Sequence, residues 1–473
     1  MSYNFRPLQR DQMYLMPPAL QDWLPENDLS WFILDAVSQM DLEEFYQKYR
    51  PDGWGNAAFE PTMMVGLLLY AFCLGERSSR RIEWLCERDI GFRIVTANQI
   101  PDHTTIARFR QQHEEELNGL FTQVLLLCAQ AGLVKVGVVA LDGTKMKANA
   151  SLSANRTYAS IEEEVKRMLA EAQKTDEEED QRYGPGCRGD ELPDDLRDRA
   201  SRLARLKACK ERLEQEASYA AEVQSARLDA RSAQEAESGK KLRGRKPKAP
   251  PEAHEMVSKA NLTDPDSRVM KTRTGYVQGY NAQAVVTENQ IIIAAELTQE
   301  ANDVHQLHPM LDLAQRNLEA IGSKERIGVA LADAGYWSQA NMEQAEAEGP
   351  ELLVATTKDW KQRKALRDGP SPRGRIPSGL SFRERMERKL LTRRGRELYK
   401  KRGKTVEPVF GQVKDARGCD GFMRRGRNAC DSEWKLLSAA HNLLKLWRSI
   451  VKAVEKACRL ACISGKVRYE GVA

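Results

Sequence analysis

The chain has 473 residues, more than a single hydrophobic core usually organises, so we expect two or three domains. Charged residues make up 30% and aromatic residues 7%, which is typical of a mostly helical protein with a solvated surface. The longest apolar run, residues 63–74, is shorter than the roughly 20 residues that a bilayer span needs. No charged and then apolar leader opens the chain, so we expect a cytoplasmic protein with no membrane partner.

Basic residues are concentrated in one segment. The formal net charge is only +5, but residues 361–430 contain 22 Lys and Arg against 7 Asp and Glu, a local net charge of +15. Such a segment attracts polyanions such as nucleic acid. The nine cysteines form no C-x-x-C pair and the six histidines show no zinc-ligand spacing, which argues against a disulfide framework or a zinc site.

Residues 1–132 are expected to form an all-helical N-terminal domain. Within it, residues 78–113 predict two short helices joined by a linker, and the second helix carries Arg108 and Arg110. This pattern suits a helix-turn-helix whose arginines contact DNA. Two ordinary core helices with solvated arginines are the alternative.

Two short apolar runs each lead to an acidic residue. The run in residues 138–147, VVALDGTKMK, predicts a buried strand that ends at Asp142, with Gly143 forming a turn. The run in residues 327–335, IGVALADAG, repeats the arrangement and delivers Asp333. Taken alone, acids in such positions are often only strand terminators or helix caps.

A segment of different composition, residues 151–254, separates these two strands. Its two stretches rich in Ala, Glu, Arg and Lys predict an antiparallel helical hairpin inserted after the first core strand. The segment closes with a basic tract in which Arg243 and Arg245 suit insertion into a DNA minor groove. A solvated basic linker is the alternative.

The remaining elements predict an α/β fold. A strand hairpin over residues 276–297 precedes a helix, the strand to Asp333, a second helix and a strand over residues 352–355. This order resembles the ribonuclease H-like fold, a mixed sheet flanked by helices in which the two acid-bearing strands are neighbours. We assign it to residues 133–150 plus 255–462, followed by a tail at 463–473.

The basic C-terminal part of this domain predicts three helices. The first covers residues 381–399 and is interrupted by Gly403, and the second is capped by Thr405 and carries Glu407 near its start. The third is a long amphipathic helix over residues 432–462, capped by Ser432.

Three blocks of sequence then resemble those of DDE transposases of bacterial insertion sequences, in the group with a Tyr, Arg, Glu, Lys signature. The blocks are Leu141-Asp142-Gly143-Thr144, Ala332-Asp333-Ala334-Gly335-Tyr336, and Tyr399 to Arg402 followed by Glu407-Pro408-Val409-Phe410-Gly411 and Lys414. Gly279-Tyr280-Asn281-Ala282-Gln283 is also similar to the family. One departure is that four residues, rather than three, separate Arg402 from Glu407.

The resemblance implies that Asp142, Asp333 and Glu407 are the catalytic, metal-binding acids. Carboxylates suit Mg²⁺, for which Mn²⁺ can substitute, and two ions per site serve phosphodiester chemistry. The resemblance also implies DNA contacts by Tyr399, Arg402 and Lys414, while Asn281 and Thr144 lie near the site. The implied partners are double-stranded DNA, as terminal inverted repeats and target, and a second copy of the chain in a homodimer.

The sequence therefore predicts a metal-dependent DNA transposase that cuts the ends of a mobile element and joins its 3′-hydroxyl to target DNA. Two alternatives stay open. One is a ribonuclease H-like nuclease without strand transfer, and the other is a DNA-binding protein whose catalysis is lost.

Overall fold

The computed structural model describes residues 19, 22–49, 57–167, 194–238, 259–272, 275–357, 359, 361–362, 364, 368–377 and 379–463. Arg243 and Arg245, residues 168–193 of the expected hairpin and the tail beyond residue 463 lie outside this range. No helix within the described ranges is both long and apolar enough to cross a membrane.

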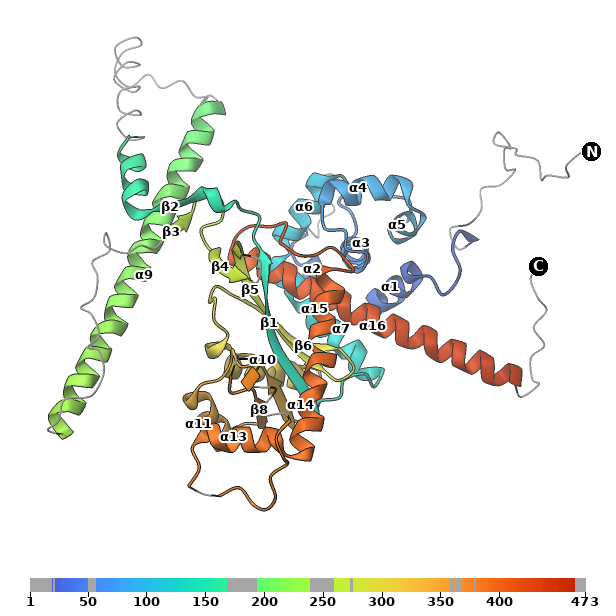
Figure 1. The fold of residues 1–473 in the computed structure, drawn as a ribbon. Coiled ribbons are helices and arrows are strands. Elements are labelled where there is room, and N and C mark those ends of the chain that lie inside the picture. The colour runs from blue at the N-terminus through green and yellow to red at the C-terminus, as the bar shows by residue number, and fades with distance from the viewer. Residues whose placement is uncertain are drawn as a thin grey trace, which may run out of the picture.

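The N-terminal part of the chain is helical (Figure 1). Pro61 begins its apolar helix α3, where the missing N–H of proline is harmless. Asp102 caps helix α6 by accepting hydrogen bonds from the backbone N–H groups of Thr104 and Thr105. The stretch expected as a linker contains a short helix, α5. The helices are α1 (Leu29–Ser38), α2 (Glu43–Tyr46), α3 (Pro61–Cys73), α4 (Ser79–Arg88), α5 (Ile90–Val95), α6 (His103–Gln112) and α7 (Glu114–Gln130).

A six-stranded mixed sheet follows, as the sequence predicts. Strand β1 (Val138–Lys147) lies in the middle, antiparallel to β5 (Gly275–Thr287) and parallel to β7 (Val329–Ala332). Strand β7 in turn pairs in parallel with β8 (Glu351–Val354). Strands β4 (Arg268–Thr272) and β6 (Ile292–Thr298) both pair with β5. Strand β4 was not predicted, and β1 continues past Asp142, where the sequence predicted its end. The other core strands agree with the prediction.

Helices pack against this sheet and cover its edge. Asn442 in helix α16 accepts a hydrogen bond from the backbone N–H of Ile292 and donates one to its carbonyl, each at 2.8 Å. These bonds satisfy polar groups on the open edge of β6 that would otherwise be unpaired. The helices of this part are α10 (Leu307–Ala320), α11 (Gln339–Glu348), α13 (Phe382–Leu391), α14 (Arg393–Thr405), α15 (Glu407–Lys414) and α16 (Arg427–Ile463).

Three helix boundaries differ from the sequence prediction. The basic helix breaks at Thr392, whose side chain caps α14 by accepting from Gly395 N–H, and α14 continues through Gly403. Thr405 is the last residue of α14 and its hydroxyl donates to the Lys401 carbonyl, so it does not cap α15. Ser432 lies inside α16 rather than at its start.

The insertion begins and ends at a separate two-stranded sheet. Strands β2 (Asn155–Thr157) and β3 (Lys259–Asn261) pair at its base, where 3₁₀ helix η2 (Leu152–Ala154) also lies. Its long helix α9 (Asp194–Ser238) has 45 residues. Leu206, Cys209 and Leu213 of α9 pack on Ile161 in a separate small core. Among the described residues of α9 beyond Ala217, no side chain is buried.

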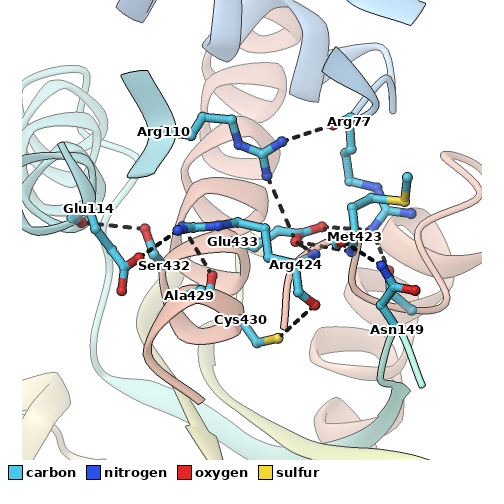
Figure 2. Close-up of polar contacts among 11 residues, drawn as sticks. Arg77, Arg110, Glu114, Asn149, Met423, Arg424, Ala429, Cys430, Ser432 and Glu433 are labelled. Atoms are coloured by element: carbon cyan, nitrogen blue, oxygen red, sulfur yellow. Dashed lines mark hydrogen bonds and ion pairs between the residues drawn. The ribbon is translucent and has the colours of Figure 1, made fainter. Parts of the chain in front are cut away.

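The N-terminal helices and the sheet share one contiguous hydrophobic core. A buried ion cluster joins them as well (Figure 2). Glu433 of α16 is fully buried and accepts hydrogen bonds from Arg77 Nη1 at 3.0 Å and from the backbone N–H groups of Met423 and Arg424 at 3.1 Å. Arg110 Nη2 lies 3.8 Å from the same carboxylate. We call Arg77, Arg110 and Glu433 the Glu433 cluster.

Candidate active site

Asp142 lies inside β1 and not at its end, because β1 stays paired with β5 as far as Lys147. The pairing of β1 with β7 stops earlier, at Ala140 opposite Leu331. Asp142 therefore lies two residues past the point where the two parallel strands part, and 17% of its side chain is exposed. Gly143 is not in a turn. It faces Gln283 across the strands, and a Cβ there would collide with the Gln283 amide.

Asp333 directly follows β7. Its Oδ1 accepts a hydrogen bond of 2.6 Å from the backbone N–H of Gly335, which fixes the carboxylate at the start of the loop. Because β1 and β7 are parallel neighbours, Asp142 and Asp333 come to the same end of the sheet. Sequence reasoning predicted this arrangement from the strand order.

Glu407 is the first residue of α15, and its side chain is 62% exposed. It is linked to Asp142 through Arg402, whose Nη1 lies 3.2 Å from Glu407 Oε1 and 3.4 Å from Asp142 Oδ2. The Arg402 side chain is 13% exposed, so its charge acts where water screens poorly. One guanidinium thus joins two of the three predicted acids.

The surroundings of Asp142 disfavour its ionised form. Burial raises the pKa of Asp142 to about 7, with Arg402 opposing the rise and Asp333 and Asp303 adding to it. Burial, together with the same carboxylates, also raises the pKa of Tyr336 well above its ordinary value. Negative charge at this end of the sheet is therefore only partly compensated by the protein.

Asp303, which the sequence analysis did not identify, is the additional carboxylate. It lies in the loop between β6 and α10, just before the 3₁₀ helix η4 (Val304–Gln306). Its Oδ1 accepts hydrogen bonds from Asn281 Nδ2 at 2.7 Å and from Gln283 Nε2 at 2.8 Å. The sequence signal for a site here was the pair of amide side chains, Asn281 and Gln283, at alternate positions of the strand β5. Only Asn281 was named as a candidate site residue.

Three other residues predicted to lie near the site or to contact DNA are Tyr399, Lys414 and Thr144. Tyr399 donates its hydroxyl hydrogen to the Ala332 carbonyl at 3.2 Å, which ties α14 to the end of β7. Lys414 Nζ donates to the carbonyl of Lys145 at 2.6 Å, and burial lowers the pKa of Lys414. Thr144 is half-buried in β1 opposite Ala282.

The two arginines expected in the helix-turn-helix have opposite environments. Arg108 is exposed on α6. Arg110 is buried, donates a 3.0 Å hydrogen bond to the Arg77 carbonyl and belongs to the Glu433 cluster (Figure 2). The expected DNA contact of Arg110 is therefore wrong, because its guanidinium is enclosed by protein groups and cannot reach a phosphate.

The donor chemistry of the site suits a hard divalent cation, although the side chains are not gathered as a closed metal site. Within the described part of the chain, no three Asp, Glu, His or Cys side chains converge closely enough to hold a metal. The nearby acids nevertheless offer only oxygen donors, which Mg²⁺ prefers. Asn281 adds a buried Oδ1 that accepts no hydrogen bond from the described residues.

Two family models match the chain. A model described as "Transposase domain (DUF772)" matches residues 18–112, and one described as "Transposase DDE domain" matches residues 247–443. Together they cover more than half of the chain, on both sides of residues 113–246. No curated protein and no solved structure matches.

Proposed function

Because the chain belongs to the DDE transposases of insertion sequences, we propose that it cuts the ends of a mobile element and joins them to target DNA. The proposed catalytic acids are Asp142, Asp333 and Glu407. The observation that carries this assignment is the parallel pairing of β1 with β7, with Arg402 linking Asp142 to Glu407.

The proposal assigns a part of the chemistry to each segment. Residues 1–132 bind the DNA ends, and residues 133–150 plus 255–462 form a ribonuclease H-like catalytic domain. The mixed sheet flanked by helices supports that fold. Residues 151–254 form the helical insertion, and residues 463–473 form a tail.

Proteins of this family generally depend on a divalent metal. We propose that Asp142, Asp333 and Glu407 hold two Mg²⁺ ions, which Mn²⁺ can replace. Bound ions of this kind activate the attacking oxygen and stabilise the leaving oxygen of an in-line displacement. Asp142 must lose its proton before it binds a cation, so its raised pKa makes the site sensitive to pH near neutrality.

Two displacements on DNA follow from this assignment. Water first attacks the phosphodiester at the element end, so that the P–O3′ bond breaks and a 3′-hydroxyl is released. That hydroxyl then attacks a target phosphodiester, forming a new P–O bond and releasing the target strand's own 3′-hydroxyl. Arg402, beside Asp142 and Glu407, is placed to contact a phosphate.

The proposed partners are double-stranded DNA, both terminal inverted repeats and target, and a second copy of the chain. Further proposed DNA contacts are made by Tyr399, Lys414 and Arg108, and by Arg243 and Arg245, which lie outside the described residues. Binding that relies on such cations releases counterions from DNA and therefore weakens as salt rises.

The test is cleavage and joining of a DNA end by the wild type, Asp142→Asn and Glu407→Gln. Glu397→Gln is a matched control, because the Glu397 side chain on α14 is 63% exposed against 62% for Glu407. We expect both site variants to lose cleavage and the control to keep it. Full metal-dependent cleavage by either site variant would refute the assignment. Cleavage without joined products would indicate a nuclease, and binding without cleavage would indicate a DNA-binding protein.

A further inference from the structure

A partly buried network of hydrogen bonds lies beside the acids and has no part in the function proposed above. Asp303 is its centre, and both amides of β5, Asn281 and Gln283, donate to Asp303 Oδ1. The Lys145 ammonium lies 3.6 Å from the same oxygen and donates to the Ala301 carbonyl at 2.7 Å. The carboxylate of Asp303 is therefore held in one orientation from two strands.

This orientation directs the other oxygen of Asp303 at Asp333. A Cβ added to Gly335 would lie 2.8 Å from Asp333 Oδ1 and 3.2 Å from Asp303 Oδ2. One oxygen of each carboxylate thus lies within 3.2 Å of the same point beside Gly335, so the two side chains are close neighbours. Like charges held this close favour a cation between or beside them.

Asn281 provides an independent observation that points to a ligand. Its side chain is fully buried, and its Nδ2 is committed to Asp303 and to the Glu300 carbonyl. Its Oδ1 accepts no hydrogen bond from the described residues, and it lies 2.8 Å from the position of a Cβ on Gly143. A buried acceptor without a partner is costly, so its retention beside the carboxylates suits a cation or water held by one.

We propose that Asp303 is a fourth carboxylate of the cation site, on the Asp333 side, with Asn281 and Gln283 as its positioning residues. The ligand is a hydrated divalent cation such as Mg²⁺ or Mn²⁺. Mg²⁺ usually keeps several waters, so an acid next to the directly bound ligands still contributes through one of those waters. Amides that fix a carboxylate in this way raise the affinity of metal sites. The inference rests on the proposed function of Asp142 and Asp333.

The test is cation binding by the full-length protein, measured as the decrease in free Mn²⁺ by electron paramagnetic resonance, with Mg²⁺ as a competitor. Asp303→Asn keeps an Oδ1 for both amides and replaces only the oxygen that faces Asp333. We expect it to lower Mn²⁺ affinity about tenfold, while the melting temperature of the metal-free protein stays unchanged. Asp303→Glu, which restores the charge, should recover part of the affinity. Asp312→Asn, at an exposed position of α10, is the matched control.

The outcomes separate this inference from the proposed function. If Asp142→Asn loses Mn²⁺ affinity and Asp303→Asn binds like the wild type, the inference is overturned and the proposed acids stand. If Asp142→Asn binds Mn²⁺ like the wild type, the proposed acid assignment and the inference both fail. If Asp303→Asn does not fold, Asp303→Ser removes the same charge, and unchanged affinity in that variant also overturns the inference.

Discussion

The molecule contains two clusters of poorly exposed charge that are built in opposite ways. In the Glu433 cluster, one buried carboxylate meets two guanidinium groups and two backbone N–H groups. At the candidate active site, the carboxylates of Asp142, Asp333 and Asp303 outnumber their cationic neighbours, Arg402 and Lys145. In the first cluster the protein itself supplies more positive than negative charge, and the paired carboxylate of Glu433 joins the N-terminal helices to the sheet. The second is left short of positive charge, which is the condition for binding a cation.

The largest expected effect tests the compensated cluster. Glu433→Gln removes the charge that Arg77 and Arg110 share, which leaves two buried guanidinium groups without a counter-ion. Breaking a buried ion pair in this way costs about 3–5 kcal/mol of unfolding free energy. Chemical denaturation measures the loss, with the exposed Glu397→Gln as control. A loss below about 1 kcal/mol would show that the cluster does not hold the two parts together.

The next effect tests the undercompensated site. Mg²⁺ should stabilise the wild type, by about 2.7 kcal/mol at a hundred times its dissociation constant. Because a carboxylate must be ionised to bind the cation, the effect should be larger at pH 8 than at pH 5.5. Thermal unfolding with and without Mg²⁺ measures it, and Asp142→Asn should show little stabilisation. An equal Mg²⁺ effect in wild type and variant would contradict the comparison.

A smaller effect of opposite sign to the Glu433 variant is expected for Asp142→Asn without metal. The folded-state pKa of Asp142 is about 7 against an ordinary 3.8, so between these values the folded state binds more protons than the unfolded state. Stability from this group therefore falls as pH rises through that window. Removing the carboxyl charge should stabilise the metal-free protein by about 2 kcal/mol at pH 8, and by less at pH 5. The measurement is the melting temperature of the metal-free wild type and Asp142→Asn from pH 5 to pH 8. A lower melting temperature of Asp142→Asn at pH 8 would contradict the prediction.

The smallest effect concerns an exposed ion pair of similar length. Lys147 Nζ lies 2.6 Å from Asp420 Oδ2, and about 60% of each side chain is exposed (60% and 59%). Water screens such a pair, so Asp420→Asn should change the unfolding free energy by less than about 1 kcal/mol. Denaturant titration of Asp420→Asn and Glu433→Gln compares the two losses of unfolding free energy. A much smaller loss for Asp420→Asn would show that burial of the ion pair determines the loss.

The sequence was informative where local pattern determines structure. The apolar runs before Asp142 and Asp333 predicted two strands, and the resemblance of the strand order to the ribonuclease H-like fold implied that they are neighbours, as the structure shows. The burial of Arg110 was not predictable in this way, since its ion-pair partner Glu433 lies more than 300 residues further along the chain. Asp303 was missed for a related reason: it lies in a loop, and only the pairing of β5 with β1 shows why Asn281 and Gln283 are polar.

Helix boundaries in the basic region were also beyond local reasoning. Gly403 was expected to interrupt a helix, but a single glycine costs only about 1 kcal/mol relative to alanine, and α14 continues through it. The actual break is at Thr392, where a side-chain cap on Gly395 starts α14.

The stretch of α9 without buried side chains is about as long as one turn of B-form DNA. Beyond Ala217, none of the described side chains of the helix is buried, and Figure 1 shows α9 lying apart from the main sheet. At 1.5 Å per residue this stretch is about 32 Å long, close to the roughly 34–36 Å of one turn of B-form DNA. A straight helix of that length spans the same distance as about ten base pairs of a duplex.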